Sequence, residues 1–231
     1  MSALPAETAE RRKRVTHRLE AFSDIVIGFS LAQLTLSLVI PVHVIDFVQR
    51  PLGIIAFLVT FVLVVRFWWL HFVIFEHYFE PTRLTVTCNF IALASLILQI
   101  FSLQLYVHFV PTLAEGIDAS RLYFGFFVLS YGMLCVMLAV WLHQRWGALT
   151  AGRRQAGLQA ALRIAGTVAG CAVGNVLSTH VMPQVYVLAN SRGDVVATFP
   201  WAILFFTLAG TLAGFVMGRL RPEAFHRFRT S

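Results

Sequence analysis

Charged side chains are scarce in this sequence. Lysine, arginine, aspartate and glutamate make up 13% of its 231 residues, whereas 58% are hydrophobic. Soluble domains carry about 25% charged and about 45–50% apolar residues. A surface exposed to water cannot be covered with so few charges. The composition therefore excludes an ordinary soluble domain and makes lipid the expected solvent for the apolar excess.

Cysteine is also scarce, and common enzyme motifs are missing. The three cysteines, Cys88, Cys135 and Cys171, fall in separate apolar segments without metal-ligand spacing, so we expect no metal and no other cofactor. The sequence has no phosphate-binding Gly-Lys loop, no His-Glu-x-x-His and no Gly-x-Ser-x-Gly motif, so we expect no enzyme. The formal charge of +7 is better explained by basic cytoplasmic loops than by nucleic acid, which we do not expect as a partner.

Six apolar runs are long enough to cross a bilayer, since a helical span needs about 20 residues. They cover residues of about 22–40, 52–75, 86–110, 122–142, 158–188 and 195–217. The runs are continuous, whereas a β-barrel strand alternates over about 9–11 residues. We therefore predict an all-α polytopic membrane protein with six transmembrane helices.

Lysine and arginine are distributed unevenly between the two ends of these spans. Fourteen lie at the end that holds both termini, and only three lie at the other end, namely Arg50, Arg121 and Arg192. The positive-inside rule then places both termini in the cytoplasm. The predicted division is a basic cytoplasmic segment at 1–15, a six-helix membrane domain at 16–220 and a basic cytoplasmic tail at 221–231.

Three ionisable side chains lie inside the first two spans: Asp24, Arg66 and His71. A charge at the centre of a span costs roughly 2.5–3.5 kcal/mol, so each needs a partner. The first two spans are antiparallel, which puts Asp24 and His71 at similar depth, and we expect a hydrogen bond or ion pair between them. Arg66 is long enough to reach Asp24 as well. A proton relay and a structural link between helices both stay open.

The first span also has a polar face, and the last two spans have glycine ladders. Ser23, Ser30, Gln33 and Ser37 recur at helical spacing, so they share one face, which lines either water or a helix interface. Glycines four residues apart predict close helix packing at Gly166, Gly170, Gly174, Gly210 and Gly214.

Two motifs resemble a known family. The run Arg18-Leu-Glu-Ala-Phe22-Ser23-Asp24 resembles the R-x-x-x-F-S-D motif in the first helix of the transmembrane protein 175 family of potassium channels, and Trp68-Trp-Leu-His71 fits the W-x-x-H element of its second helix. The resemblance implies a passive potassium channel subunit of the bacterial six-helix type, conducting potassium or other monovalent cations as a homotetramer in a bacterial plasma membrane. It also implies a cluster that supports the first helix, formed by Arg18, Phe22, Ser23, Asp24, Trp68 and His71.

The same resemblance makes the first helix the lining of a central pore. The principal constriction falls on Phe29, the next ring near Ala32 and Gln33, and a further ring near Leu36. Such a ring of bulky apolar side chains acts as a dewetting barrier to ions. Phe29 is larger than the family's usual Ile or Leu, and Ala32 and Gln33 replace a Thr and a Leu. A preference for potassium over sodium therefore does not follow from these residues.

Two other functions remain open. A proton-coupled small-solute transporter would use Asp24, Arg66 and His71 at a site between broken helices. A non-conducting membrane scaffold would give no ion flux at all.

Overall fold

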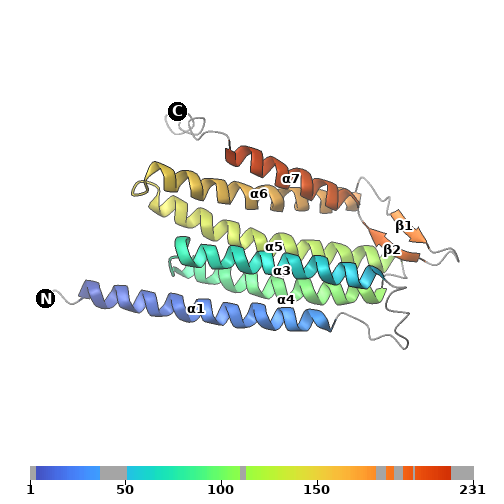
Figure 1. Ribbon diagram of the computed structural model, residues 1–231, viewed down its shortest axis with the longest axis horizontal. Coiled ribbons are helices and arrows are strands. Elements are labelled where there is room, and N and C mark those ends of the chain that lie inside the picture. Colours follow the sequence, from blue (N-terminus) through green and yellow to red (C-terminus); the bar gives the residue numbers. More distant parts are fainter. Residues whose placement is uncertain are drawn as a thin grey trace.

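The computed structural model describes residues 4–36, 51–109, 113–180, 186–189, 195–199 and 201–219. Within these ranges the chain forms six helices and one two-stranded hairpin. The helices are α1 (Leu4–Thr35), α3 (Pro51–Tyr78), α4 (Arg83–Phe109), α5 (Leu113–Arg145), α6 (Ala151–His180) and α7 (Trp201–Arg219). They lie along the long axis of the molecule, and the first residues of α1 and the last residues of α7 lie at the same end (Figure 1).

The apolar runs are helical because a backbone in lipid must satisfy its hydrogen bonds within its own segment. Four described stretches are long and apolar enough to cross a membrane: Phe57–Tyr78, Arg83–His108, Asp118–Arg145 and Ala151–Leu177. A shorter apolar stretch of α7 covers Thr207–Val216. The first predicted span extends to residue 40, and its part from residue 37 lies outside the described residues. The predicted all-α class with six helices is confirmed.

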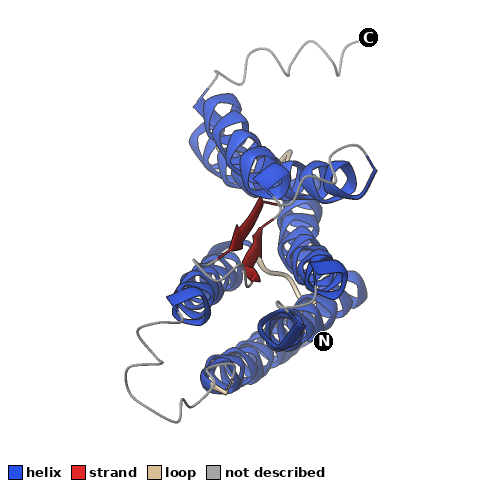
Figure 2. Cartoon of the chain, turned by 90° about the vertical axis from the view of Figure 1, so that its right-hand side faces the viewer, coloured by secondary structure: helices blue, strands red, loops and turns tan. Residues whose placement is uncertain are grey.

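The last two predicted spans need a correction at the end opposite the termini. The fifth was expected to continue to residue 188 and the sixth to begin at 195. Instead α6 ends at His180, and strands β1 (Tyr186–Ala189) and β2 (Val195–Phe199) pair antiparallel with Tyr186 opposite Phe199. β2 has the sequence Val-Val-Ala-Thr-Phe, rich in β-branched residues that favour strands. Figure 2 looks from the hairpin end and shows the helices nearly end-on, with the two strands near the middle of the view.

The core lies between α3, α4 and α5. Its fully buried side chains include Phe67 of α3, Leu96 and Ile100 of α4, and Leu134 and Met137 of α5. α1 packs against α3 and α4, whereas α6 and α7 pack mainly against each other, with α5 beside α6. The molecule therefore has a central group of three helices with α1 on one side and the α6–α7 pair on the other.

The glycine ladders hold α6 against α7. A Cβ on Gly166 would lie 2.8 Å from the Cα of Gly214, and a Cβ on Gly210 would lie 2.7 Å from the Cα of Gly170. Real Cβ atoms do not approach a neighbouring backbone this closely, so only glycine permits the contact. Beside the ladder, the hydroxyls of Thr167 and Thr211 lie 3.0 Å apart. The predicted small-residue packing is thus intramolecular.

Replacing Gly166 with leucine should push α7 away from α6. Because the neighbouring atoms belong to the backbone and cannot rotate aside, we expect a loss of at least the roughly 1–3 kcal/mol typical of overpacking. The measurement is the midpoint of thermal unfolding in detergent, followed by size-exclusion chromatography with fluorescence detection.

Gly152→Leu is the matched control, because it lies on the same helix and an added Cβ there meets nothing within 4 Å. Equal losses in the two variants would contradict close backbone packing as the cause.

Candidate functional site

α1 has two different faces. Its buried face packs against α3 and α4 and consists of Leu19, Ser23, Ile27, Ser30 and Leu34. The opposite face is an apolar stripe with alternating spacings of three and four residues, which we call the α1 stripe: Phe22, Ile25, Phe29, Ala32 and Leu36. Side chains at these spacings lie above one another on a helix. Phe22, at the start of the stripe, is 46% exposed, whereas Ile25, Phe29 and Leu36 are 68–75% exposed.

The stripe contains three of the four predicted constriction residues. Phe29 and Leu36 are each 75% exposed, Ala32 is also exposed, and Ile25, which the sequence reasoning did not name, is 68% exposed. Gln33 differs, since it is half-buried beside α4, and its backbone carbonyl accepts a hydrogen bond from Gln104 Nε2 at 3.5 Å. Gln33 thus lies at the edge of the stripe.

The serines of the predicted polar face point into the subunit. The Ser23 hydroxyl donates to the carbonyl of Leu19 at 2.8 Å, and the Ser30 hydroxyl donates to the carbonyl of Val26 at 2.8 Å. Both side chains are buried. Of the two interpretations of this face, the structure supports a helix interface for Ser23 and Ser30; Ser37 lies outside the described residues.

A buried hydrogen-bonded chain joins α1, α3 and α4. His71 Nε2 lies 2.8 Å from Asn89 Oδ1, and Asn89 Nδ2 donates to the Ser23 hydroxyl at 3.1 Å. All three side chains are fully buried. The Ser23 proton is already used on Leu19, so Ser23 accepts from the amide, which leaves Asn89 Oδ1 to accept from His71 Nε2–H.

A second link joins α1 to α3 at the exposed edge of this chain. The indole Nε1–H of Trp68 donates to Asp24 Oδ1 at 3.0 Å. The expected direct bond between Asp24 and His71 is absent from the described contacts, because each side chain has a different partner. The reason is geometric: Ser23 and Asp24 point 100° apart on α1, so Ser23 faces inward toward Asn89 while Asp24 faces the edge.

Phe22 and Arg18 lie apart from this chain. Phe22 makes an edge-to-face contact with Phe90 of α4, with ring centroids 5.9 Å apart. Arg18 is exposed four residues before Phe22, in line with the α1 stripe, and makes no hydrogen bond or ion pair within the described ranges. The structure therefore joins four of the six predicted cluster residues by hydrogen bonds. Phe22 contacts α4 next to them through its ring, and Arg18 is not part of the cluster.

Arg66 points away from α1. Two residues, or about 200° of rotation, separate it from Trp68, which faces Asp24. Its side chain is exposed. The expected approach of Arg66 to Asp24 is not found among the ion pairs of the described residues.

Asn89 is the functional candidate that the sequence reasoning missed. A signal was present, because an amide inside an apolar span needs a partner just as Asp24 and His71 do. In the described part of the chain, no group of three His, Cys, Asp or Glu side chains is placed to hold a metal ion.

Comparisons with known proteins find similarity to potassium channels. Residues 18–99 match the family model described as endosomal/lysosomal potassium channel TMEM175. A protein of Marivirga tractuosa described as a potassium channel is 28% identical over 100 residues, which are 43% of this chain and 40% of that protein. The alignment thus spans well under half of either protein.

A solved structure extends the comparison to the fold. A variant of the potassium channel MtTMEM175, crystallised with a nanobody–MBP fusion protein, matches with a TM-score of 0.56 at 18% identity, over 88% of this chain and 92% of that chain. The matched family segment contains both motifs and Asn89. The resemblance to the TMEM175 potassium channel family, predicted from the two motifs at residues 18–24 and 68–71, is therefore confirmed.

Proposed function

We propose that this chain is the subunit of a potassium-type cation channel, a homotetramer whose central pore is lined by the α1 stripe. The observation that carries the proposal is the stripe itself, a continuous row of large apolar side chains on the uncovered face of α1. It lies inside the segment that matches the potassium channel family model. Four copies around an axis would turn the row into stacked apolar rings.

The proposed rings form a barrier by excluding water. With a rise of 1.5 Å per residue, the rings from Phe29 to Leu36 extend over roughly 10 Å of the pore. An ion crossing that length has to shed part of its hydration shell, which is how apolar constrictions gate by dewetting. Phe29, the largest side chain in the middle of the stripe, is the proposed narrowest point. Gln33, at the edge of the stripe, would place an amide beside the Ala32 ring.

The buried chain and the Trp68–Asp24 link give α1 its orientation. A pore helix must hold its stripe toward the axis, and a rotation of 100° would replace Phe29 by Ser30. Ser23 and Asp24 are held by bonds to two other helices, which opposes such a rotation. In this proposal the motif residues therefore support the pore without lining it.

We also propose that the end of the bundle with the first residues of α1 faces the cytoplasm, in a bacterial plasma membrane. The arginine-rich end predicted from the sequence and the common end of α1 and α7 are the same end (Figure 1).

A proton-coupled transporter has less support from the geometry. Among the described residues its three ionisable groups form no hydrogen bond or ion pair with one another: Asp24 accepts from Trp68, His71 contacts Asn89, and Arg66 is exposed. Potassium flux into proteoliposomes, with sodium as the comparison ion, tests the channel directly. Absence of flux for both ions would favour a scaffold.

Phe29→Ala should raise unitary conductance severalfold and reduce the preference between potassium and sodium, because a methyl group no longer closes the apolar ring. Single-channel recording in planar bilayers measures the conductance, and the reversal potential under mixed-ion conditions measures the preference.

Phe205→Ala provides the same truncation at an exposed position of α7, which packs mainly against α6 rather than against α1. Currents unchanged by Phe29→Ala, or changed equally by Phe205→Ala, would refute the assignment of the constriction.

Asn89→Leu should destabilise the subunit by about 1–3 kcal/mol, because it leaves the buried Nε2–H of His71 without an acceptor. It also removes the amide from which Ser23 accepts, although the Ser23 hydroxyl keeps its bond to the Leu19 carbonyl. Trp68→Phe removes only an exposed bond to Asp24, so its cost should stay near about 1 kcal/mol. Thermal unfolding in detergent compares the two variants. A stability of Asn89→Leu equal to wild type would show that the buried chain does not hold α1.

A further inference from the structure

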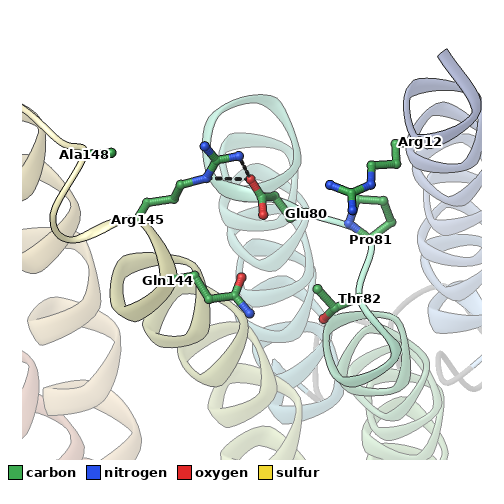
Figure 3. Close-up of a pocket in the computed structure, with 7 residues that line it drawn as sticks. All are labelled: Arg12, Glu80, Pro81, Thr82, Gln144, Arg145 and Ala148. Carbon is green, nitrogen blue, oxygen red and sulfur yellow. Dashed lines mark hydrogen bonds and ion pairs between the residues drawn. The ribbon is translucent and has the colours of Figure 1, made fainter. Parts of the chain in front are cut away.

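A cavity of about 450 Å³ lies at the arginine-rich end of the bundle. Its wall comes from three parts of the chain: Arg12 of α1, Glu80 and Thr82 of the turn between α3 and α4, and Gln144 and Arg145 at the end of α5. Figure 3 shows the Arg12 and Arg145 side chains extending from different helices on either side of Glu80. None of the motif residues lines the cavity, which has no part in the proposed conduction.

The charge of the cavity wall is positive. Arg145 is bound to Glu80, with Nε donating to Oε1 at 2.7 Å and Nη2 bonding to the same oxygen. Those contacts use one edge of the guanidinium and leave Nη1 for another acceptor. Arg12 makes no ion pair within the described residues. Two arginines and one glutamate leave the wall with one net positive charge.

The positive charges around the cavity suit an oxyanion. The cap of α4 is internal, since Thr85 N donates to Thr82 Oγ1 at 3.2 Å and Thr82 N donates to Thr85 Oγ1 at 2.9 Å, so these groups contribute the charge of the helix end and no free donor. The amino end of α4, with its partial positive charge, therefore adjoins the two guanidinium groups. Gln144 adds an amide. Guanidinium groups are well matched to phosphate oxygens.

The surroundings also suit a lipid headgroup. Trp146 follows Arg145 directly, and the guanidinium of Arg154 lies 5.6 Å from the centre of its ring. Tryptophan and arginine at the end of a span are typical of the level of the lipid headgroups. A cavity of net charge +1 at that level matches a single phosphodiester.

We propose that this cavity is a binding site for one phosphate group, taken either from an anionic phospholipid or from free phosphate. The bound group bridges Arg12 on α1 and Arg145 on α5, and so connects the first helix to the far side of the core. The site does not depend on whether the protein conducts ions.

The test is a binding titration of the full-length protein in detergent at physiological ionic strength, read by microscale thermophoresis. The probes are dihexanoyl phosphatidylglycerol, inorganic phosphate and dihexanoyl phosphatidylcholine, whose choline group cancels the phosphate charge. We expect phosphatidylglycerol, inorganic phosphate or both to bind more tightly than phosphatidylcholine. Arg12→Gln should weaken that binding about tenfold, since it removes a charge-assisted contact.

Arg11→Gln is the matched control, because Arg11 is the neighbouring exposed arginine and does not line the cavity. Its effect should stay within about twofold, as for a distant surface charge. If Arg12→Gln weakens the binding of phosphatidylglycerol alone, the site is specific for lipid. If it weakens the binding of inorganic phosphate alone, the site is specific for free phosphate. If it weakens the binding of both anionic probes, the site accepts phosphate from either source. No binding by either anionic probe, unchanged binding in Arg12→Gln, or equal weakening in Arg11→Gln would overturn the proposal.

Discussion

One side-chain amide holds the first helix in place. Asn89 of α4 contacts His71 of α3 on one side and Ser23 of α1 on the other, and none of the three is exposed. Inside a membrane protein such groups have no water to bind, so the three-helix arrangement is the one that satisfies them together. Together with the Trp68–Asp24 link, this contact ties α1 to both neighbouring helices and so orients the α1 stripe.

The two faces of α1 follow from this constraint. Ser23 and Ser30 are turned inward, and the Oγ of each also bonds to a carbonyl of its own helix. Phe29 and Leu36 are consequently turned outward, each with 75% of its surface exposed. A side chain that the subunit leaves uncovered meets either lipid or another copy. The proposed pore requires that the α1 stripe meets other copies.

The far side of the subunit is held by a different interaction. Gly166 and Gly210 let the backbones of α6 and α7 touch, so van der Waals contact replaces the polar contacts used around α1. The family model ends at residue 99, before this pair, whereas the solved channel matches 88% of the chain by fold. The motif sequence is thus concentrated where the polar contacts are, and the remaining helices share the fold with little shared sequence.

The sequence by itself determined the all-α membrane class, the six helices and the motif residues of the first two. The length, hydropathy and residue spacing of a segment are local properties, so they are evident without knowing which helices pack against it. Only the tertiary structure decided that His71 bonds to Asn89 rather than Asp24, that Asp24 accepts from Trp68, and that Tyr186–Ala189 and Val195–Phe199 form a hairpin. Depth along a helix is set by residue number, but which partner a side chain meets depends on how each helix is rotated against the others. That rotation results from packing among residues far apart in the chain.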